Sequence, residues 1–218
     1  EYEGKTGRIL RPIMLERGIE NSHIFNIKVR CKVDRVDMEF EKEEGKWTAT
    51  GRFVIYDYKK GKSKGLDHIL RNNVCQLGIY YFLIEEEFRK MGFNAVDCMA
   101  LLYYGIEENS EDDGKGIKYD GIYREEYKKA LGLGRKHYAM DSEVFEAFLQ
   151  DIREITIDAV DMIRAGKFPY APNCPVYTER FARYSCEYKD ICRYSRDKII
   201  HILDEGGHIC YGEAFRGL

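Results

Sequence analysis

The sequence lacks any apolar run that approaches the roughly 20 residues needed to cross a bilayer, so we expect no membrane-spanning helix. The opening segment from Glu1 to Lys5 is polar, which excludes a signal peptide at this point. It also begins without a methionine, which is consistent with a fragment of something longer. With 44% hydrophobic and 33% charged residues in 218, the composition is that of an ordinary soluble globular protein with room for one sizeable domain.

An excess of positive charge is also missing. The formal net charge is −3, which argues against a uniformly basic nucleic-acid binder. A local basic patch is nevertheless present, because Lys59, Lys60, Lys62 and Lys64 lie close together around Gly61. Contacts with phosphates depend on the local field, so this patch is compatible with nucleic-acid binding, and equally with a solvated loop.

Cysteines are present in an odd number, seven, with no signal peptide before them. This combination disfavours a disulfide framework and favours a cytoplasmic location. Ligation of a metal or cluster, or simple burial, must account for the cysteines.

The pattern of apolar residues predicts an α/β fold with a mixed central sheet flanked by helices. Alternating residues from Ile27 to Val33 indicate a strand, and a charged hairpin turn follows at Glu41 to Gly45. Further strands are expected at residues 47–58, 95–104 and 117–122, and helices at 72–91, 123–131 and from Asp141 or Ser142 to Gly166. Beyond residue 167 the prolines and cysteines cluster, so we expect a core at 1–167 and a small cysteine-bearing appendage at 168–218.

The most informative segment is the end of the strand at 47–58, where Asp57 is followed two residues later by Lys59. Side chains alternate along a strand, so these two point the same way. An antiparallel neighbour would bring Asp34 close to Asp57, and these carboxylates with the backbone carbonyl of Tyr58 could hold Mg²⁺ or Mn²⁺. Asp37 would face the other way. Lys59 could orient a water or stabilise the transition state of phosphodiester hydrolysis.

Two further polar residues fall on the helix predicted next. Gln76 and Tyr80 are four residues apart and therefore share a helix face. Gln76 could hold the scissile phosphate or a water, and Tyr80 could pack beneath the site or contact DNA.

Three segments in this order carry a resemblance. Residues 33–37 (VDRVD), 55–61 (IYDYKKG) and 76–80 (QLGIY) resemble the successive motifs of the PD-(D/E)XK nuclease superfamily, in its RecB/AddB-like exonuclease branch. The resemblance implies a restriction-endonuclease-like fold. It also implies that Asp34 and Asp57 are metal ligands, that Lys59 is the catalytic lysine, and that Gln76 and Tyr80 are the supporting pair.

Two departures from the family pattern stand out. Cys31 occupies a position where the family often has glycine. The family also places a histidine or glutamate on a helix upstream of the first aspartate, whereas here only about 30 residues precede it, with Glu16 and His23 in no convincing helix. Either that helix is missing from this chain, or the site is built without it.

The C-terminal cysteines allow several interpretations. Cys174, Cys186 and Cys192 resemble three of the four ligands of the [4Fe–4S] cluster of AddB-like nucleases, with Arg183 where the family has another cysteine. A Zn²⁺ site using His201 or His208, or no metal at all, are the alternatives. In each case the tail would present basic residues to nucleic acid, among them Arg183 and Arg193.

The sequence therefore predicts a Mg²⁺- or Mn²⁺-dependent deoxyribonuclease, of the exonuclease type, in recombination, repair or phage-type DNA processing. Its expected partners are DNA and a helicase subunit or other recombination protein, with no membrane. The alternatives are a non-catalytic DNA-binding or cluster-bearing scaffold in a helicase–nuclease complex, and a plain metal-binding interaction module.

Overall fold

The computed structural model describes residues 2–60, 75–106, 117–133 and 138–166. The chain divides into two compact units, residues 1–156 and 157–218. All the described elements belong to the first unit, except for the last turns of the final helix. The boundary expected at residue 167 stays a prediction.

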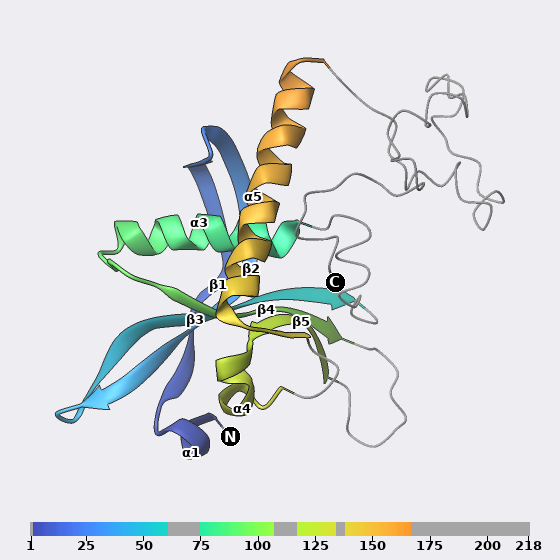
Figure 1. The fold of residues 1–218 in the computed structure, drawn as a ribbon. Coiled ribbons are helices and arrows are strands. Elements are labelled where there is room, and N and C mark those ends of the chain that lie inside the picture. Colours follow the sequence, from blue (N-terminus) through green and yellow to red (C-terminus); the bar gives the residue numbers. More distant parts are fainter. Residues whose placement is uncertain (1, 61–74, 107–116, 134–137, 167–218) are drawn as a thin grey trace, which may run out of the picture. The chain divides into compact units, whose positions relative to one another are not determined.

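The described part of the first unit contains a six-stranded mixed sheet whose strands follow the order of the sequence (Figure 1). The pairs β3–β4 and β5–β6 are parallel and the other three pairs are antiparallel. The strands are β1 (Ile9–Ile24), β2 (Ile27–Glu43), β3 (Lys46–Lys60), β4 (Asp97–Ile106), β5 (Ile117–Arg124) and β6 (Tyr138–Met140).

The helices are short except for two. They are α1 (Tyr2–Thr6), α3 (Gln76–Lys90), the 3₁₀ turn η1 (Glu125–Tyr127), α4 (Lys128–Leu131) and α5 (Ser142–Arg164). None of the described helices has the length and apolar character that a membrane crossing requires. The predicted mixed sheet flanked by helices is confirmed.

Tight turns set the register of the first three strands. Glu44 and Gly45 have φ angles of 49° and 82° and link β2 to β3, where the sequence predicted a hairpin. Phe25 and Asn26, with φ of 52° and 60°, link β1 to β2 in the same way. Two successive residues with positive φ are characteristic of the hairpin turn whose twist matches that of the strands.

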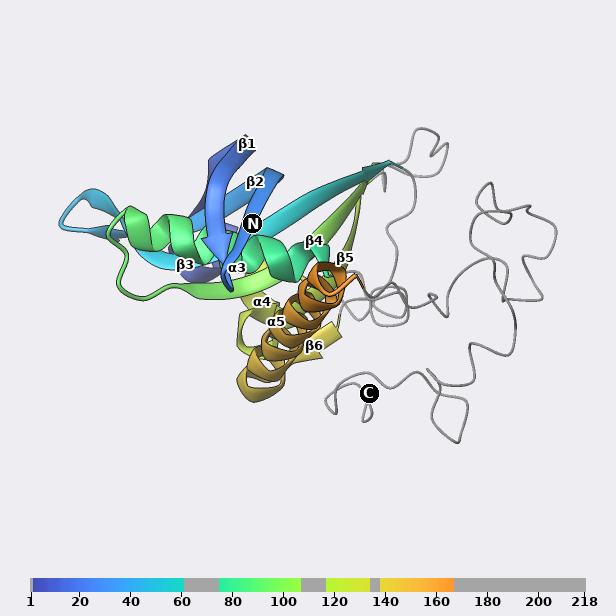
Figure 2. The same cartoon turned by 90° about the horizontal axis from the view of Figure 1, so that it is seen from above.

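Helices α3 and α5 pack together on one face of the sheet. α3 contacts β1, β3 and β4 and crosses over the strands in both views (Figures 1 and 2). The ring of Phe53 in β3 lies 5.1 Å from that of Phe88 and 6.3 Å from that of Tyr81, centroid to centroid. A Cβ atom on Gly78 would lie 2.7 Å from a methyl carbon of Ile152, so the glycine lets the two helices approach closely.

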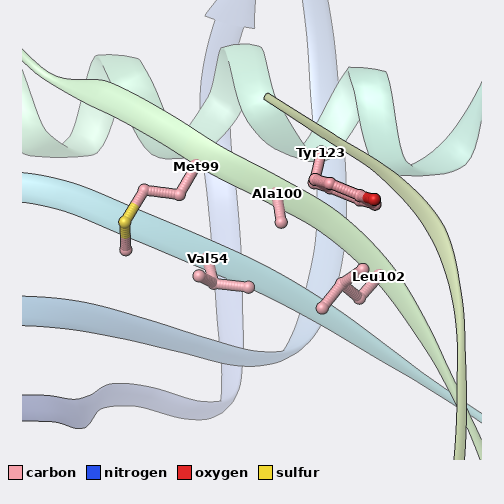
Figure 3. Packing of buried hydrophobic residues seen from close by; sticks show 5 residues of the cluster. All are labelled: Val54, Met99, Ala100, Leu102 and Tyr123. Carbon is pink, nitrogen blue, oxygen red and sulfur yellow. The ribbon is translucent and has the colours of Figure 1, made fainter. Parts of the chain in front are cut away.

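The opposite face is covered by shorter elements. Its buried cluster consists of Val54, Met99, Ala100, Leu102 and Tyr123 (Figure 3). Tyr127 and Leu131 pack against this cluster. The two faces together bury the central strands, which explains why β3 and β4 are apolar on both sides.

Several element boundaries differ from the sequence predictions. Residues Tyr123 and Arg124 complete β5, so the helix expected at 123–131 begins later, as η1 and α4. In α3, Cys75 occupies the N-cap position without a side-chain cap, and the predicted caps Asn72 and Asn73 lie outside the described residues. Strands β1 and β6 had not been predicted.

Candidate active site

Asp34 and Asp57 lie on adjacent antiparallel strands. The β2–β3 register ends at the pair Arg35 and Tyr56, and Asp34 and Asp57 are the residues that follow at this end of the two strands. Opposite residues of an antiparallel pair share a face of the sheet. Oδ2 of Asp34 accepts a hydrogen bond of 2.7 Å from the backbone N–H of Tyr58, which fixes this carboxylate beside β3.

The carboxylate of Asp57 is held by two side chains. Only 2% of Asp57 is exposed. Nζ of Lys59 lies 2.5 Å from its Oδ2 in an ion pair. Nε2 of Gln76 donates a hydrogen bond of 2.8 Å to its Oδ1. The structure thus brings together the acid and the amine that the sequence placed two residues apart.

Gln76 connects the members of the site. Its Oε1 accepts a hydrogen bond of 3.0 Å from Nζ of Lys59, and its Nε2 also donates to the hydroxyl of Tyr80 at 2.9 Å. The Tyr80 hydroxyl in turn donates to the carbonyl oxygen of Lys32 at 3.1 Å. A lysine can only donate, so the amide oxygen of Gln76 must face Lys59 and its NH₂ group must face Asp57. The first turn of α3 is thereby anchored to both β2 and β3.

The positive charge of Lys59 only partly compensates the buried carboxylate of Asp57. Burial raises the pKa of Asp57, the hydrogen bond and charge of Lys59 oppose that rise, and the charge of Asp34 adds to it. Oδ2 of Asp57 is fully buried, and apart from its ion pair with Lys59 it accepts no hydrogen bond from the described residues. A buried carboxylate with a raised pKa and an oxygen that accepts no hydrogen bond is a candidate cation ligand.

These residues fit a small divalent cation. Among the described residues, no group of three or more His, Cys, Asp or Glu side chains comes together as a metal site. Mg²⁺ is commonly held by only one or two carboxylates plus substrate phosphates and water, so Asp34 and Asp57 form a sufficient donor set. The carbonyl of Tyr58 as a further ligand stays a prediction.

Asp37 lies outside the site, as its position in the strand predicted. Arg35 grips it with two hydrogen bonds, Nε to Oδ1 at 2.6 Å and a terminal nitrogen to Oδ2 at 2.7 Å. The arginine also lies 5.2 Å from the ring centroid of Tyr56, on the other side of the sheet from Asp57. The negative charge of Asp37 is thus balanced by Arg35, and Asp37 is not a candidate metal ligand.

The upstream part of the chain supplies no helical ligand in the described residues. Glu16 and His23 lie in strand β1, and the only described helix before it is the five-residue α1. Cys31, at the position where the resemblance expects glycine, is half-buried in β2, and burial raises the pKa of its thiol.

Some predicted site residues fall outside the described residues. They are Lys62, Lys64, Cys174, Arg183, Cys186, Cys192 and Arg193, together with the side chain of Lys60. One residue beside the site was missed: Tyr103 in β4 is the register partner of Asp57. Only the pairing of β3 with β4, which are distant in sequence, reveals it.

A comparison with protein families identifies a family over most of the chain. No curated protein matches the chain. A model of the PD-(D/E)XK nuclease superfamily matches residues 1–193 of the 218, which include Asp34, Asp57, Lys59, Gln76 and Tyr80. Members of that superfamily are typically metal-dependent nucleases, and the match agrees with the mixed sheet flanked by helices. The chain therefore belongs to the PD-(D/E)XK nuclease superfamily.

Proposed function

We propose that this protein is a Mg²⁺- or Mn²⁺-dependent deoxyribonuclease that hydrolyses phosphodiester bonds in DNA. The observation that carries the proposal is the buried carboxylate of Asp57, which is held next to Asp34 and contacted by the amine of Lys59. Membership of a nuclease superfamily supports the same reaction.

Each side chain of the site has a part in this reaction. Asp34 and Asp57 would hold the cation. When bound, the cation would neutralise charge on the scissile phosphate and lower the pKa of an attacking water. Lys59, with 38% of its side chain exposed, would supply a positive charge where negative charge develops. Gln76 holds the side chains of Lys59 and Asp57 in position relative to each other, because its amide forms hydrogen bonds with both.

The finer part of the proposal rests on the resemblance to RecB- and AddB-like enzymes. It includes exonuclease action, a role in recombination, repair or phage-type DNA processing, and a helicase or other recombination protein as partner. It also includes DNA contacts by the basic residues after β3 and in the C-terminal tail, and a [4Fe–4S] cluster or Zn²⁺ on the tail cysteines.

One observation favours a second function. The described helix upstream of Asp34 is the five-residue α1, and its Glu3 joins no cluster of metal-ligating side chains among the described residues. The site therefore has two carboxylates where the family pattern expects a third group. A site with weakened metal affinity would suit a non-catalytic scaffold that binds DNA within a helicase–nuclease complex.

The decisive experiment is a cleavage assay on linear DNA with Mn²⁺ or Mg²⁺ and with a chelator. We expect metal-dependent cleavage by the wild type, and a loss of at least about a thousandfold in the Asp57→Ala variant, because that change removes a cation ligand.

The matched control is Glu43→Gln, an exposed carboxylate on the same strand as Asp34 but nine residues further along, roughly 30 Å away. This variant should cleave like the wild type. Cleavage that survives Asp57→Ala would refute the assignment of the site, and absence of cleavage in the wild type would favour the scaffold.

A further inference from the structure

Tyr103 is a buried polar residue that the site described so far does not use. It lies in β4 and is only 2% exposed. Its hydroxyl is fully buried and has no hydrogen-bond partner among the described residues. Buried hydroxyls in native proteins are nearly always paired, and leaving one unpaired destabilises the fold. A phenylalanine would fill the same space without that cost, so the hydroxyl calls for an explanation.

The position of Tyr103 points to the active site. In the parallel β3–β4 ladder Tyr103 pairs with Asp57, so the two side chains leave the same face of the sheet side by side. Nζ of Lys59 lies 5.3 Å from the centroid of the Tyr103 ring, within the range of a cation–π interaction. The ring is therefore a second contact of the ammonium, in addition to the carboxylate of Asp57.

The charged and titratable groups around the Tyr103 hydroxyl belong to the candidate active site. Burial raises the pKa of Tyr103, and the charges of Asp57, Tyr80 and Cys75 act in the same direction. These are residues of β3 and of the start of α3, the elements that build the site. The hydroxyl stays protonated, and its oxygen keeps lone pairs that can accept a hydrogen bond.

Resting on the proposed nuclease function, we propose that Tyr103 is a positioning residue for Lys59. Its ring holds the ammonium beside Asp57 by a cation–π contact. Its hydroxyl oxygen is the acceptor to which Lys59 donates once a divalent cation competes for the carboxylate of Asp57. The ammonium and the cation cannot both occupy Oδ2. Lys59 would then keep the amide oxygen of Gln76 as one acceptor, and the unpaired hydroxyl of Tyr103 would replace the carboxylate as another.

The test uses two variants of the full chain, Tyr103→Phe and Tyr103→Leu, in steady-state DNA cleavage with Mn²⁺, together with thermal unfolding. We expect Tyr103→Phe to lower kcat about tenfold, the size of one lost hydrogen bond to a charged group, with KM unchanged within about twofold. Its unfolding midpoint should equal or exceed that of the wild type, because the variant loses an unpaired hydroxyl. Tyr103→Leu should lower kcat further, because the ring contact is lost as well.

The control is Tyr123→Phe, a buried tyrosine in the cluster on the opposite face of the sheet. It should leave kcat unchanged. Wild-type kcat in Tyr103→Phe would overturn the proposal. So would a kcat that falls only together with the unfolding midpoint, since that result indicates a purely structural role.

A readout without activity separates this inference from the nuclease function. If the wild type cleaves no DNA, the proposed function fails, and the pairing of Tyr103 with Lys59 is then judged from unfolding midpoints of Lys59→Met, Tyr103→Leu and the double variant. Non-additive midpoint shifts support the contact between the two side chains, and additive shifts overturn it.

Discussion

Two carboxylates of the same sheet, Glu39 and Asp57, are equally buried, each with 2% exposure, yet their surroundings differ. Glu39 accepts hydrogen bonds from the hydroxyl of Tyr2 at 2.5 Å, from Thr50 at 2.9 Å and from Arg52 at 3.0 Å. Asp57 has one hydrogen bond from Gln76 and the ion pair with Lys59.

The difference shows in the pKa of each group. Burial alone would raise the pKa of Glu39, but its hydrogen bonds from Tyr2, Arg52 and Thr50 outweigh burial and lower it. Burial raises the pKa of Asp57, and Lys59 does not fully compensate. A buried carboxylate such as Glu39, whose charge is balanced by several hydrogen-bond donors, stabilises the fold. A buried carboxylate such as Asp57, with fewer donors, is available to bind a cation.

The largest expected effect is on stability. Glu39→Gln should lower the free energy of unfolding by about 2–3 kcal/mol, because it weakens hydrogen bonds to a buried charge. Asp57→Asn should not lower it, since the change removes a charge that burial disfavours. Urea unfolding of the metal-free proteins measures both. A larger loss in Asp57→Asn than in Glu39→Gln would reverse the roles assigned to the two carboxylates.

A divalent cation should sharpen the contrast. Mg²⁺ or Mn²⁺ at a hundred times its dissociation constant should stabilise the wild type by about 2.7 kcal/mol, because it binds the folded state. Glu39→Gln should gain the same increment from a lower starting point. Asp57→Asn should gain little, having lost a ligand. Thermal unfolding with and without metal reports these increments, and equal gains in all three proteins would place the cation elsewhere.

The smallest effect is on the pH dependence of stability in the metal-free chain. The lowered pKa of Glu39 stabilises the fold above the ordinary glutamate pKa of about 4.3, and this contribution disappears as the pH falls through the lowered value. The raised pKa of Asp57 works in the opposite direction. Its contribution is fully present below about pH 3.9 and is lost as the pH rises through the raised value.

Unfolding at a series of pH values between about 3 and 7 tests these two signs. The deficit of Glu39→Gln relative to the wild type should shrink toward acid. The advantage of Asp57→Asn should shrink toward acid as well, because the wild-type aspartate is then neutral too. If the differences in unfolding free energy between each variant and the wild type do not change with pH, the pKa directions assigned to Glu39 and Asp57 are wrong.

Much of the sheet was predictable from local patterns. The alternation from Ile27 to Val33 and the apolar run before Asp57 gave β2 and β3, and the glycine at 45 marked the turn between them. β1 was missed because Pro12, Gly18 and several charges interrupt its alternation. β6 was missed because three residues are too few to show a period.

The residues of the site were predictable for a different reason. Asp57, Lys59, Gln76 and Tyr80 lie at spacings that a strand and a helix convert directly into shared faces. Glu39 carried no such signal, since a charged residue near a hairpin is ordinarily exposed. Its role depends on donors from Tyr2 and Arg52, which only the folded chain brings to it.

The sequence by itself determined which side chains leave the same face of each element, because the periods of strand and helix are fixed by backbone geometry. It therefore specified the acid, the amine and the amide of the site. The tertiary structure alone decided which elements are neighbours. The parallel pairing of β3 with β4 places Tyr103 beside Asp57, and the packing of α3 on the sheet brings Gln76 to Lys59 and Asp57. Pairing between distant segments is governed by burial of both sheet faces, and no local spacing encodes it.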